Sequence, residues 1–302
     1  MDDRIYDSVL DLIGRTPIVR LKRLSPSKGG EVLGKLENLN PAGSVKDRPA
    51  LQMILDAEAR GEIGEGATII EATSGNTGIS LAMIAAVRGY QCVLVMPEDM
   101  SVARRQILQS YGAEVVLTPP EEGMAGAVER AEALLAETKN AIMPRQFSNP
   151  SNPDAHAKTT AEEIWRATGG ELDAFVAGVG TGGTLSGVAR VLKQRRPSLH
   201  VVAVEPRGSA VLSGGKPGLH GIQGLGAGFV PEVLDRALVD EVVTVNDVAA
   251  ERAQRRLAKE EGLFVGTSAG ANVHAAVEVA KRFKPGTRIL TIICDGGERY
   301  LR

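Results

Sequence analysis

One lysine of this chain lies in a loop whose sequence could present it for covalent chemistry. The segment Asn40-Pro41-Ala42-Gly43-Ser44-Val45-Lys46-Asp47-Arg48 is rich in turn-forming residues and brings Lys46 to the predicted start of a helix. A primary amine held in this way can anchor a carbonyl cofactor, although a lysine near a helix start is more often simply solvated. The interpretation of Lys46 therefore depends on the other motifs of the chain.

Three further segments join a predicted strand to a predicted helix through a turn that contains glycine. They are Thr73 to Thr77, Gly180 to Thr184 and Gly266 to Gly270. The start of a helix exposes free N–H groups and a partial positive charge, so such junctions bind anions. A lysine together with several anion sites indicates an amino-acid substrate and a phosphorylated cofactor.

The first of these turns, Thr73-Ser74-Gly75-Asn76-Thr77-Gly78, offers hydroxyls, an amide and backbone donors at one point. Helix capping alone needs only one such side chain. The composition of the turn suits the binding of a carboxylate.

The second turn allows another class of enzyme. Gly178-Val179-Gly180-Thr181-Gly182-Gly183 matches the Gly-x-Gly-x-x-Gly pattern of dinucleotide-binding proteins, and Glu205 ends the next predicted strand near the expected distance. An NAD-dependent dehydrogenase is therefore an alternative, because the turn indicates a phosphate without identifying the molecule that carries it.

The third turn matches the Gly-x-Ser-x-Gly elbow of hydrolases at Gly266-Thr267-Ser268-Ala269-Gly270. That mechanism needs an acid followed by a histidine, yet the only later histidine, His274, precedes the candidate acid Asp295. Ser268 is better interpreted as a hydrogen-bonding residue at a helix start, and a simple N-cap explains this motif equally well.

Short apolar runs alternate with longer amphipathic segments, which predicts an α/β fold with mostly parallel, twisted sheets covered by helices. The predicted strands are 68–71, 92–96, 115–117, 174–177, 201–204, 242–245 and 289–293. The predicted helices include 78–88, 125–138, 247–261 and 272–282. Two Asn-Pro pairs in 143–153 mark a lobe boundary, and the glycine-rich stretch 206–231 predicts a long functional loop.

The composition excludes several classes of protein. The 302 residues carry a net charge of -2 and show no basic run interleaved with aromatic residues, so nucleic acid is not an expected partner. No run of roughly 20 apolar residues is present, and the chain starts with acidic residues, so a cytoplasmic location without membrane spans is expected. The two cysteines lie in apolar runs, which predicts buried thiols and no metal site.

With these four motifs in this order and spacing, the chain resembles the cysteine synthases (O-acetylserine sulfhydrylases) over nearly its whole length. These are fold type II, or tryptophan synthase β-like, pyridoxal-phosphate enzymes. The resemblance implies a smaller mobile lobe over 38–145, a larger lobe over 1–37 and 146–302, and an active site in the cleft between them. It also implies a homodimer, with the tail of serine acetyltransferase as a further partner.

The resemblance also assigns roles to single residues. Lys46 would form the Schiff base with pyridoxal phosphate, Asn76 would bond the ring oxygen, and Ser268 would bond the pyridine nitrogen. The cofactor phosphate would be held by Gly180, Thr181, Gly182, Gly183 and Thr184. The substrate carboxylate would be bound by Thr73, Ser74, Thr77 and Gln146.

The implied reaction is a β-replacement, in which O-acetylserine loses acetate to give an aminoacrylate and sulfide then adds to make cysteine. A serine beside the ring nitrogen, where other such enzymes use a carboxylate, favours elimination over chemistry that needs a long-lived carbanion. The residue after the Ser-Gly-Asn triplet is Thr77, where dehydratases of the family carry histidine, which disfavours a dehydratase.

Several alternatives stay open at this point. Cystathionine β-synthase shares the same core, and O-phosphoserine could replace O-acetylserine as the donor. The segment 71–88 and the C-terminal 294–301 look like the B-type branch of the family, whereas 220–229 looks like the A-type branch. Pro49 departs from the small residue expected there, and it fits if Asp47 caps the helix, because Pro49 then lies in the first turn.

Overall fold

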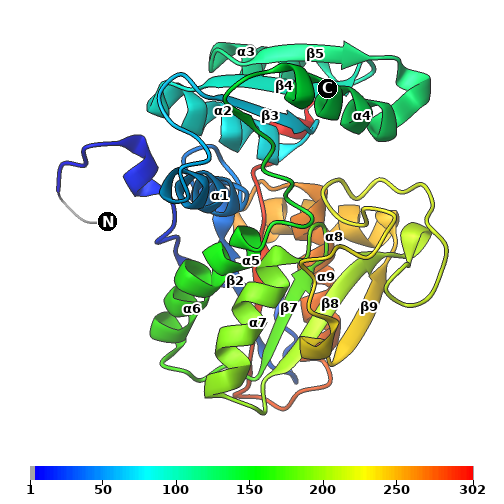
Figure 1. Ribbon diagram of the computed structural model, residues 1–302. Helices are drawn as coiled ribbons and strands as arrows, with labels where there is room; N and C mark the ends of the chain where they lie inside the picture. Colours follow the sequence, from blue (N-terminus) through cyan, green and yellow to red (C-terminus); the bar gives the residue numbers. More distant parts are fainter. Residues whose placement is uncertain (1–3, 302) are drawn as a thin grey trace. The chain divides into compact units, whose positions relative to one another are not determined.

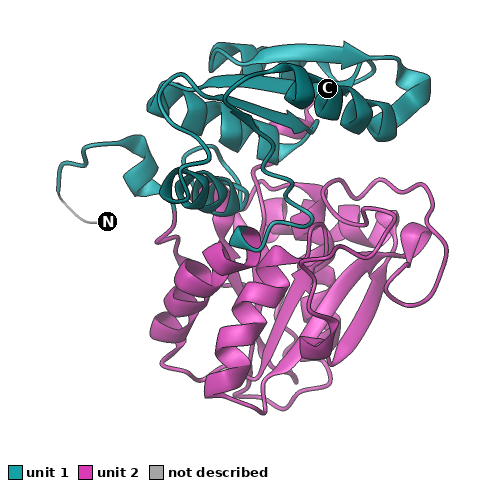
Figure 2. Cartoon of the chain, in the orientation of Figure 1, with its two compact units in different colours: residues 1–13, 40–151 teal, residues 14–39, 152–302 magenta. Residues whose placement is uncertain are grey.

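The computed structural model describes residues 4–301 (Figure 1). Met1 to Asp3 and Arg302 lie outside the described residues, as does most of the acidic start noted above. The chain divides into two compact units: the residues up to Ile13 with Asn40–Ser151 form unit 1, and Gly14–Leu39 with the residues from Asn152 onward form unit 2 (Figure 2). No helix among the described residues has the length and apolar character needed to cross a membrane.

Unit 1 is built on a four-stranded sheet in which every strand pair is parallel, in the order β5-β4-β3-β6. Its strands are β3 (Thr68–Ala72), β4 (Gln91–Pro97), β5 (Glu114–Thr118) and β6 (Ala141–Ile142). Its helices are α1 (Asp47–Ala59), α2 (Asn76–Arg88), α3 (Val102–Ser110) and α4 (Gly123–Glu137), with the 3-10 turns η1 (Val9–Leu12) and η3 (Pro120–Glu122).

The two faces of β3 pack against different helices, because successive side chains of a strand point to opposite sides. Ile69 packs in a buried cluster with residues of α1 and α2, whereas Ile70 packs with Ala127 and Ala131 of α4. Residues two apart in a strand share a face, so Glu71 points to the same side as Ile69. The polar turn at residues 73–78 connects the C-terminal end of β3 to the start of α2, and it therefore lies at one edge of the sheet.

Unit 2 contains a six-stranded sheet in the order β1-β2-β10-β7-β8-β9, in which only the β1–β2 pair is antiparallel. The strands are β1 (Ile18–Arg20), β2 (Glu31–Leu36), β7 (Ala174–Gly178), β8 (His200–Pro206), β9 (Glu241–Val245) and β10 (Arg288–Ile293). The last strand of the chain, β10, therefore lies in the middle of the sheet.

Helices cover both faces of this sheet (Figure 1). They are α5 (Ser151–Ala155), α6 (Ala161–Thr168), α7 (Gly183–Arg195), α8 (Asp247–Glu261) and α9 (Thr267–Ala280). A π-helical turn, η4 (His156–Thr160), joins α5 to α6, and shorter 3-10 turns are η2 (Glu37–Leu39), η5 (Arg207–Ser209), η6 (Arg236–Leu238) and η7 (Glu298–Tyr300).

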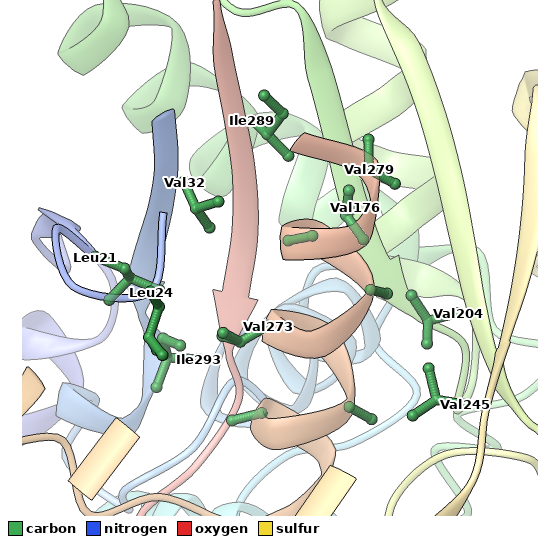
Figure 3. Packing of buried hydrophobic residues seen from close by; sticks show 14 of the residues in the cluster. Leu21, Leu24, Val32, Val176, Val204, Val245, Val273, Val279, Ile289 and Ile293 are labelled. Atoms are coloured by element: carbon green, nitrogen blue, oxygen red, sulfur yellow. The ribbon is translucent and has the colours of Figure 1, made fainter. Parts of the chain in front are cut away.

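The largest core cluster of unit 2 lies between the sheet and α9. Figure 3 shows Val176, Val204 and Ile289 from the strands facing Val273 and Val279 of α9. Their neighbours in β7, such as Phe175, point to the opposite face and are also fully buried. Burial on both faces explains why these strands read as continuous apolar runs in the sequence.

Candidate active site

Lys46 stands immediately before α1, as the loop pattern predicted. It is the N-cap residue of that helix, it is half-buried, and its amide donates to the Ser44 hydroxyl at 3.2 Å. The preceding turn is closed by the Gly43 amide, which donates to the Asn40 carbonyl at 2.7 Å, and Gly43 has a φ of 78°. A left-handed residue is needed at that point, which accounts for the glycine.

A buried carboxylate ties the Lys46 loop to the helix of the next motif. Asp47 has no exposed surface, and its Oδ2 accepts from the Ala42 amide at 2.7 Å while its Oδ1 accepts from the Ser80 hydroxyl at 2.6 Å. The Ser80 Oγ also lies 3.1 Å from the carbonyl oxygen of Asn76, one turn earlier in α2. Asp47 thus links the chain on both sides of Lys46 to the first turn of α2.

The expectation that Asp47 caps α1 is wrong. Lys46 occupies the cap position, no side chain caps the helix, and Asp47 is its first residue. Pro49 still lies in the first turn, where its missing N–H would have no partner within the helix.

The predicted carboxylate turn lies between β3 and α2. Gly75 is the N-cap, its amide donates to Thr73 Oγ1 at 3.2 Å, and the Thr77 hydroxyl donates to Gln146 Oε1 at 2.7 Å. The Arg104 guanidinium donates to the Ser74 carbonyl at 3.1 Å and fixes the outer side of the turn. Unit 1 therefore brings Gln146 next to Thr77, which lies 69 residues earlier in the chain.

The predicted phosphate turn lies in unit 2 between β7 and α7. Gly182 is the N-cap of α7 with a φ of 85°, and the Gly183 amide donates to Thr181 Oγ1 at 3.2 Å. A methyl group at Gly180 would lie within 3.0 Å of the Gly224 carbonyl oxygen, and one at Gly183 within 3.0 Å of the Asn152 amide group. Gly180 and Gly183 therefore leave no room for a side chain, and the turn, at the N-terminus of a 13-residue helix, fits a phosphate group in shape and polarity.

The two threonine side chains of this turn are supported from behind by one stretch of chain. Asn152 donates to Thr181 Oγ1 at 3.0 Å, and His156 Nε2 lies 3.1 Å from Thr184 Oγ1. His156 is buried, and its Nδ1 lies 2.9 Å from Thr160 Oγ1 within the π-helical turn. Asn152 and His156 were not predicted from the sequence, although their spacing of four residues places them on one helical face.

Ser268 is the second residue of α9 and is buried. The N-cap of α9 is Gly266, so the interpretation of Ser268 as an N-cap is wrong. Beside this turn lies the buried Asp295, which accepts a hydrogen bond from the Tyr300 hydroxyl. A methyl group at Gly266 would come within 3.0 Å of the Asp295 carboxylate, so the glycine is required for this close packing.

Glu205, the acidic residue of the dinucleotide pattern, is used within the protein. Its carboxylate is buried and accepts from the Leu212 amide at 2.7 Å, the Ser213 amide at 2.9 Å and the Ser213 hydroxyl at 2.5 Å. A carboxylate with these partners secures the start of the 206–231 loop and does not reach out to a ribose. The structure therefore disfavours the dehydrogenase alternative.

Two buried groups in unit 1 have strongly shifted acidities. Burial raises the pKa of the Glu71 carboxyl to about 7, against the opposing effects of the Arg145 and Ala72 amides and the Arg145 charge. Burial also raises the pKa of the Cys92 thiol to about 12, so this cysteine is unreactive at neutral pH. Among residues 4–301 no group of three or more His, Cys, Asp or Glu side chains could hold a metal ion.

Comparisons with known proteins identify the family of this chain. A family model described as "Pyridoxal-phosphate dependent enzyme" matches residues 9–295, so the chain belongs to this family of pyridoxal-phosphate enzymes. A protein of Bacillus subtilis (strain 168) named "Probable cysteine synthase" is 52% identical over 99% of this chain and 97% of its own length.

Two solved structures are similar to this chain over 99% of its length. A cysteine synthase from Entamoeba histolytica has a TM-score of 0.95 at 42% identity, with 90% of that chain covered. An O-ureido-L-serine synthase has a TM-score of 0.95 at 49% identity, with 94% of that chain covered. The fold is therefore the tryptophan synthase β-like fold that the resemblance implied.

Proposed function

We propose that this protein makes L-cysteine from O-acetyl-L-serine and sulfide, with pyridoxal phosphate as its cofactor. The observation that carries the proposal is the identity of about half of the residues, over the whole chain, with a protein named as a cysteine synthase. The Lys46 loop, the polar turn with Gln146 and the glycine turn before α7 support it, because each offers the groups that one part of the reaction needs.

Pyridoxal phosphate, when bound, supplies an electron sink for the carbanion that forms at the substrate Cα. We assign the phosphate to Gly180, Thr181, Gly182, Gly183 and Thr184, the ring oxygen to Asn76 and the ring nitrogen to Ser268. The Lys46 amine would hold the cofactor, and it would take the proton from the substrate Cα as a general base.

The polar turn serves the substrate. Thr73 and Ser74 offer hydroxyl protons to the substrate carboxylate, Thr77 holds Gln146 beside them, and the α2 N-terminus adds a favourable field. Gln146 accepts from the Thr77 hydroxyl through its amide oxygen, and its amide nitrogen carries the N–H groups that would donate to the same carboxylate. These groups would hold the substrate by its carboxylate.

The nucleophile distinguishes this function from its nearest competitor. The similarity to an O-ureido-L-serine synthase, at 49% identity, makes hydroxyurea a second candidate nucleophile in place of sulfide. Both reactions would use the same cofactor, the same lysine and the same loss of acetate, so only product formation separates them.

The visible absorption spectrum of the purified protein provides the test. We expect a yellow protein whose band shifts when O-acetylserine is added and returns when sulfide is added, with L-cysteine released in equal amount. Return of the band with hydroxyurea but not with sulfide would replace the proposed product. A colourless protein that pyridoxal phosphate does not reconstitute would refute the proposal altogether.

We further propose, from the family resemblance alone, that the protein is a cytoplasmic homodimer that binds the C-terminal tail of serine acetyltransferase. Sedimentation equilibrium measures the assembly state, and competition between a synthetic tail peptide and O-acetylserine measures the interaction. A monomer, or a peptide that does not compete, would contradict the corresponding part of this proposal.

A further inference from the structure

Glu71 is a buried carboxyl group that none of the roles above uses. It is the penultimate residue of β3, its side chain is 5% exposed, and it stands just before the polar turn that starts at Thr73. Its Oε2 accepts a hydrogen bond at 2.9 Å from the amide of Arg145. The residue after Arg145 is Gln146, the partner of Thr77.

The backbone at Arg145 needs such an anchor. Arg145 has a φ of 53°, in the left-handed region that costs a side-chain-bearing residue free energy. Its carbonyl accepts from the amides of Ser148 and Asn149, each at 3.0 Å, so the carboxylate of Glu71 holds one side of a tight turn and these two amides hold the other. The direction of the Gln146 side chain depends on this turn.

We infer that Glu71 is a positioning residue that holds Gln146 against Thr77 and so couples the ionisation of a buried carboxyl to the affinity for the substrate carboxylate. This inference rests on the proposed function of Thr77 and Gln146. Ionised Glu71 accepts a charge-assisted hydrogen bond from the Arg145 amide, and protonated Glu71 accepts a weaker one. The coupling therefore operates around neutral pH, where burial places the pKa of this carboxyl.

The other charged groups on this side of β3 do not account for the same pH dependence. Arg145 carries the charge that acts on Glu71, and its guanidinium pairs with Glu132 at 2.9 Å on the surface. The charged residues of the two helices that pack on this face are Asp47, Arg48, Asp56 and Glu58 of α1 and Arg88 of α2. None of these is among the causes that shift the Glu71 pKa.

The test follows the amide of Arg145 in the holoenzyme by 1H–15N NMR between pH 5.5 and 8.5. We expect its proton shift to titrate with a midpoint near the Glu71 pKa of about 7, and the titration to vanish in Glu71→Gln. Glu132→Gln is the matched control, because it removes an exposed carboxylate from the same arginine without touching the amide, and it should titrate as the wild type does.

The second measurement is the equilibrium affinity for L-alanine, which has the substrate carboxylate but no leaving group. The ratio of wild-type affinity to that of Glu71→Gln cancels the titration of the ligand amine. We expect this ratio to rise from near one at pH 6 to roughly fivefold at pH 8, because only the wild type gains a charged acceptor.

The outcomes separate this inference from the proposed function. An Arg145 amide that does not titrate, or an affinity ratio independent of pH, would overturn the role of Glu71 even if L-alanine binds normally. Failure of L-alanine to bind the wild type at any pH would overturn the proposed function, and the substrate-positioning role of Glu71 with it.

Discussion

Lys46 owes its position to the residue that follows it. Asp47 is wholly buried and binds the Ala42 amide on one side and the Ser80 hydroxyl on the other. Lys46, a half-buried residue, therefore projects from a loop whose backbone is held to α2 by hydrogen bonds. A general base whose backbone is held in place loses less conformational entropy when its side chain reaches the substrate proton.

Replacing Lys46 by alanine tests the central assignment. We expect turnover to fall by about a thousandfold or more, because both the covalent anchor and the general base are lost. Borohydride reduction should fix the cofactor to the wild type and not to Lys46→Ala, while equilibrium dialysis should still detect cofactor bound through its phosphate. The exposed Lys28→Ala serves as control. Normal turnover in Lys46→Ala would remove the assignment.

Ser268→Asp tests the residue assigned to the ring nitrogen. A carboxylate at this buried position should favour a protonated ring nitrogen, shift the cofactor absorbance and lower turnover by about tenfold or more. Thr267→Asp places the same charge one residue earlier, at the half-buried first position of α9. If both variants keep the wild-type rate and spectrum, Ser268 has no part in cofactor binding.

The predicted phosphate turn between β7 and α7 depends on the absence of a side chain at Gly180 and Gly183. Gly180→Ala would force its new methyl group against the Gly224 carbonyl oxygen. We expect at least about a tenfold loss of pyridoxal phosphate affinity, measured by equilibrium dialysis, since a small displacement misplaces several donors at once. Gly64→Ala, where nothing lies within 4 Å, should leave the affinity unchanged.

The junction between α1 and α2 gives a further prediction. Ser80→Ala leaves one oxygen of the buried Asp47 without its 2.6 Å partner, which should lower the free energy of unfolding by about 1–3 kcal/mol. Urea denaturation measures this loss. Ser110→Ala removes an exposed hydroxyl that bonds only within α3, and its change should stay within about 0.5 kcal/mol. Equal losses in both variants would mean that the contact between Ser80 and Asp47 adds no more to the free energy of unfolding than an exposed hydroxyl does.

The sequence predicted the parallel strands well because their apolar runs are continuous, as burial on both faces requires. Strand β2 was missed for a physical reason. Its sequence places Lys35 in a strand core, where the amine is fully buried and donates to Glu163 at 2.7 Å, 128 residues away, and to Thr16. No local pattern reveals that a lysine will find such partners.

The residues of the candidate site also fall into those that the sequence predicted and those that it did not. The glycine turns were visible because helix starts and left-handed residues have local signatures. Asn152, His156 and Glu71 were not, because their importance lies in contacts with Thr181, Thr184 and the Arg145 amide. Such supporting residues depend on long-range packing, so a single sequence carries no signal for them.

For the molecule as a whole, Glu71 makes stability depend on pH. Its carboxyl has a pKa near 4.5 in the unfolded chain and about 7 in the folded protein, so the folded state binds a proton more tightly. This contribution is fully present below pH 4.5 and is lost as the pH rises towards 7. Glu71→Gln cannot ionise and should not show it.

We therefore expect the unfolding free energy of Glu71→Gln, relative to wild type, to increase between pH 5 and pH 8. Urea denaturation at each pH measures the difference, and Glu132→Gln again provides the exposed control. A difference that is constant, or that decreases with pH, would show that Glu71 is already ionised at pH 5 in the folded protein.

The position of β10 affects how the protein folds during its synthesis. This strand lies between β2 and β7 in the sheet, yet it comes after both of them in the chain. Until β10 is made, β2 and β7 each have one unpaired edge, and this edge could pair with a neighbouring nascent chain. The larger sheet can close only after β10 has been synthesised, so the yield of active protein depends on how well those edges are shielded until then.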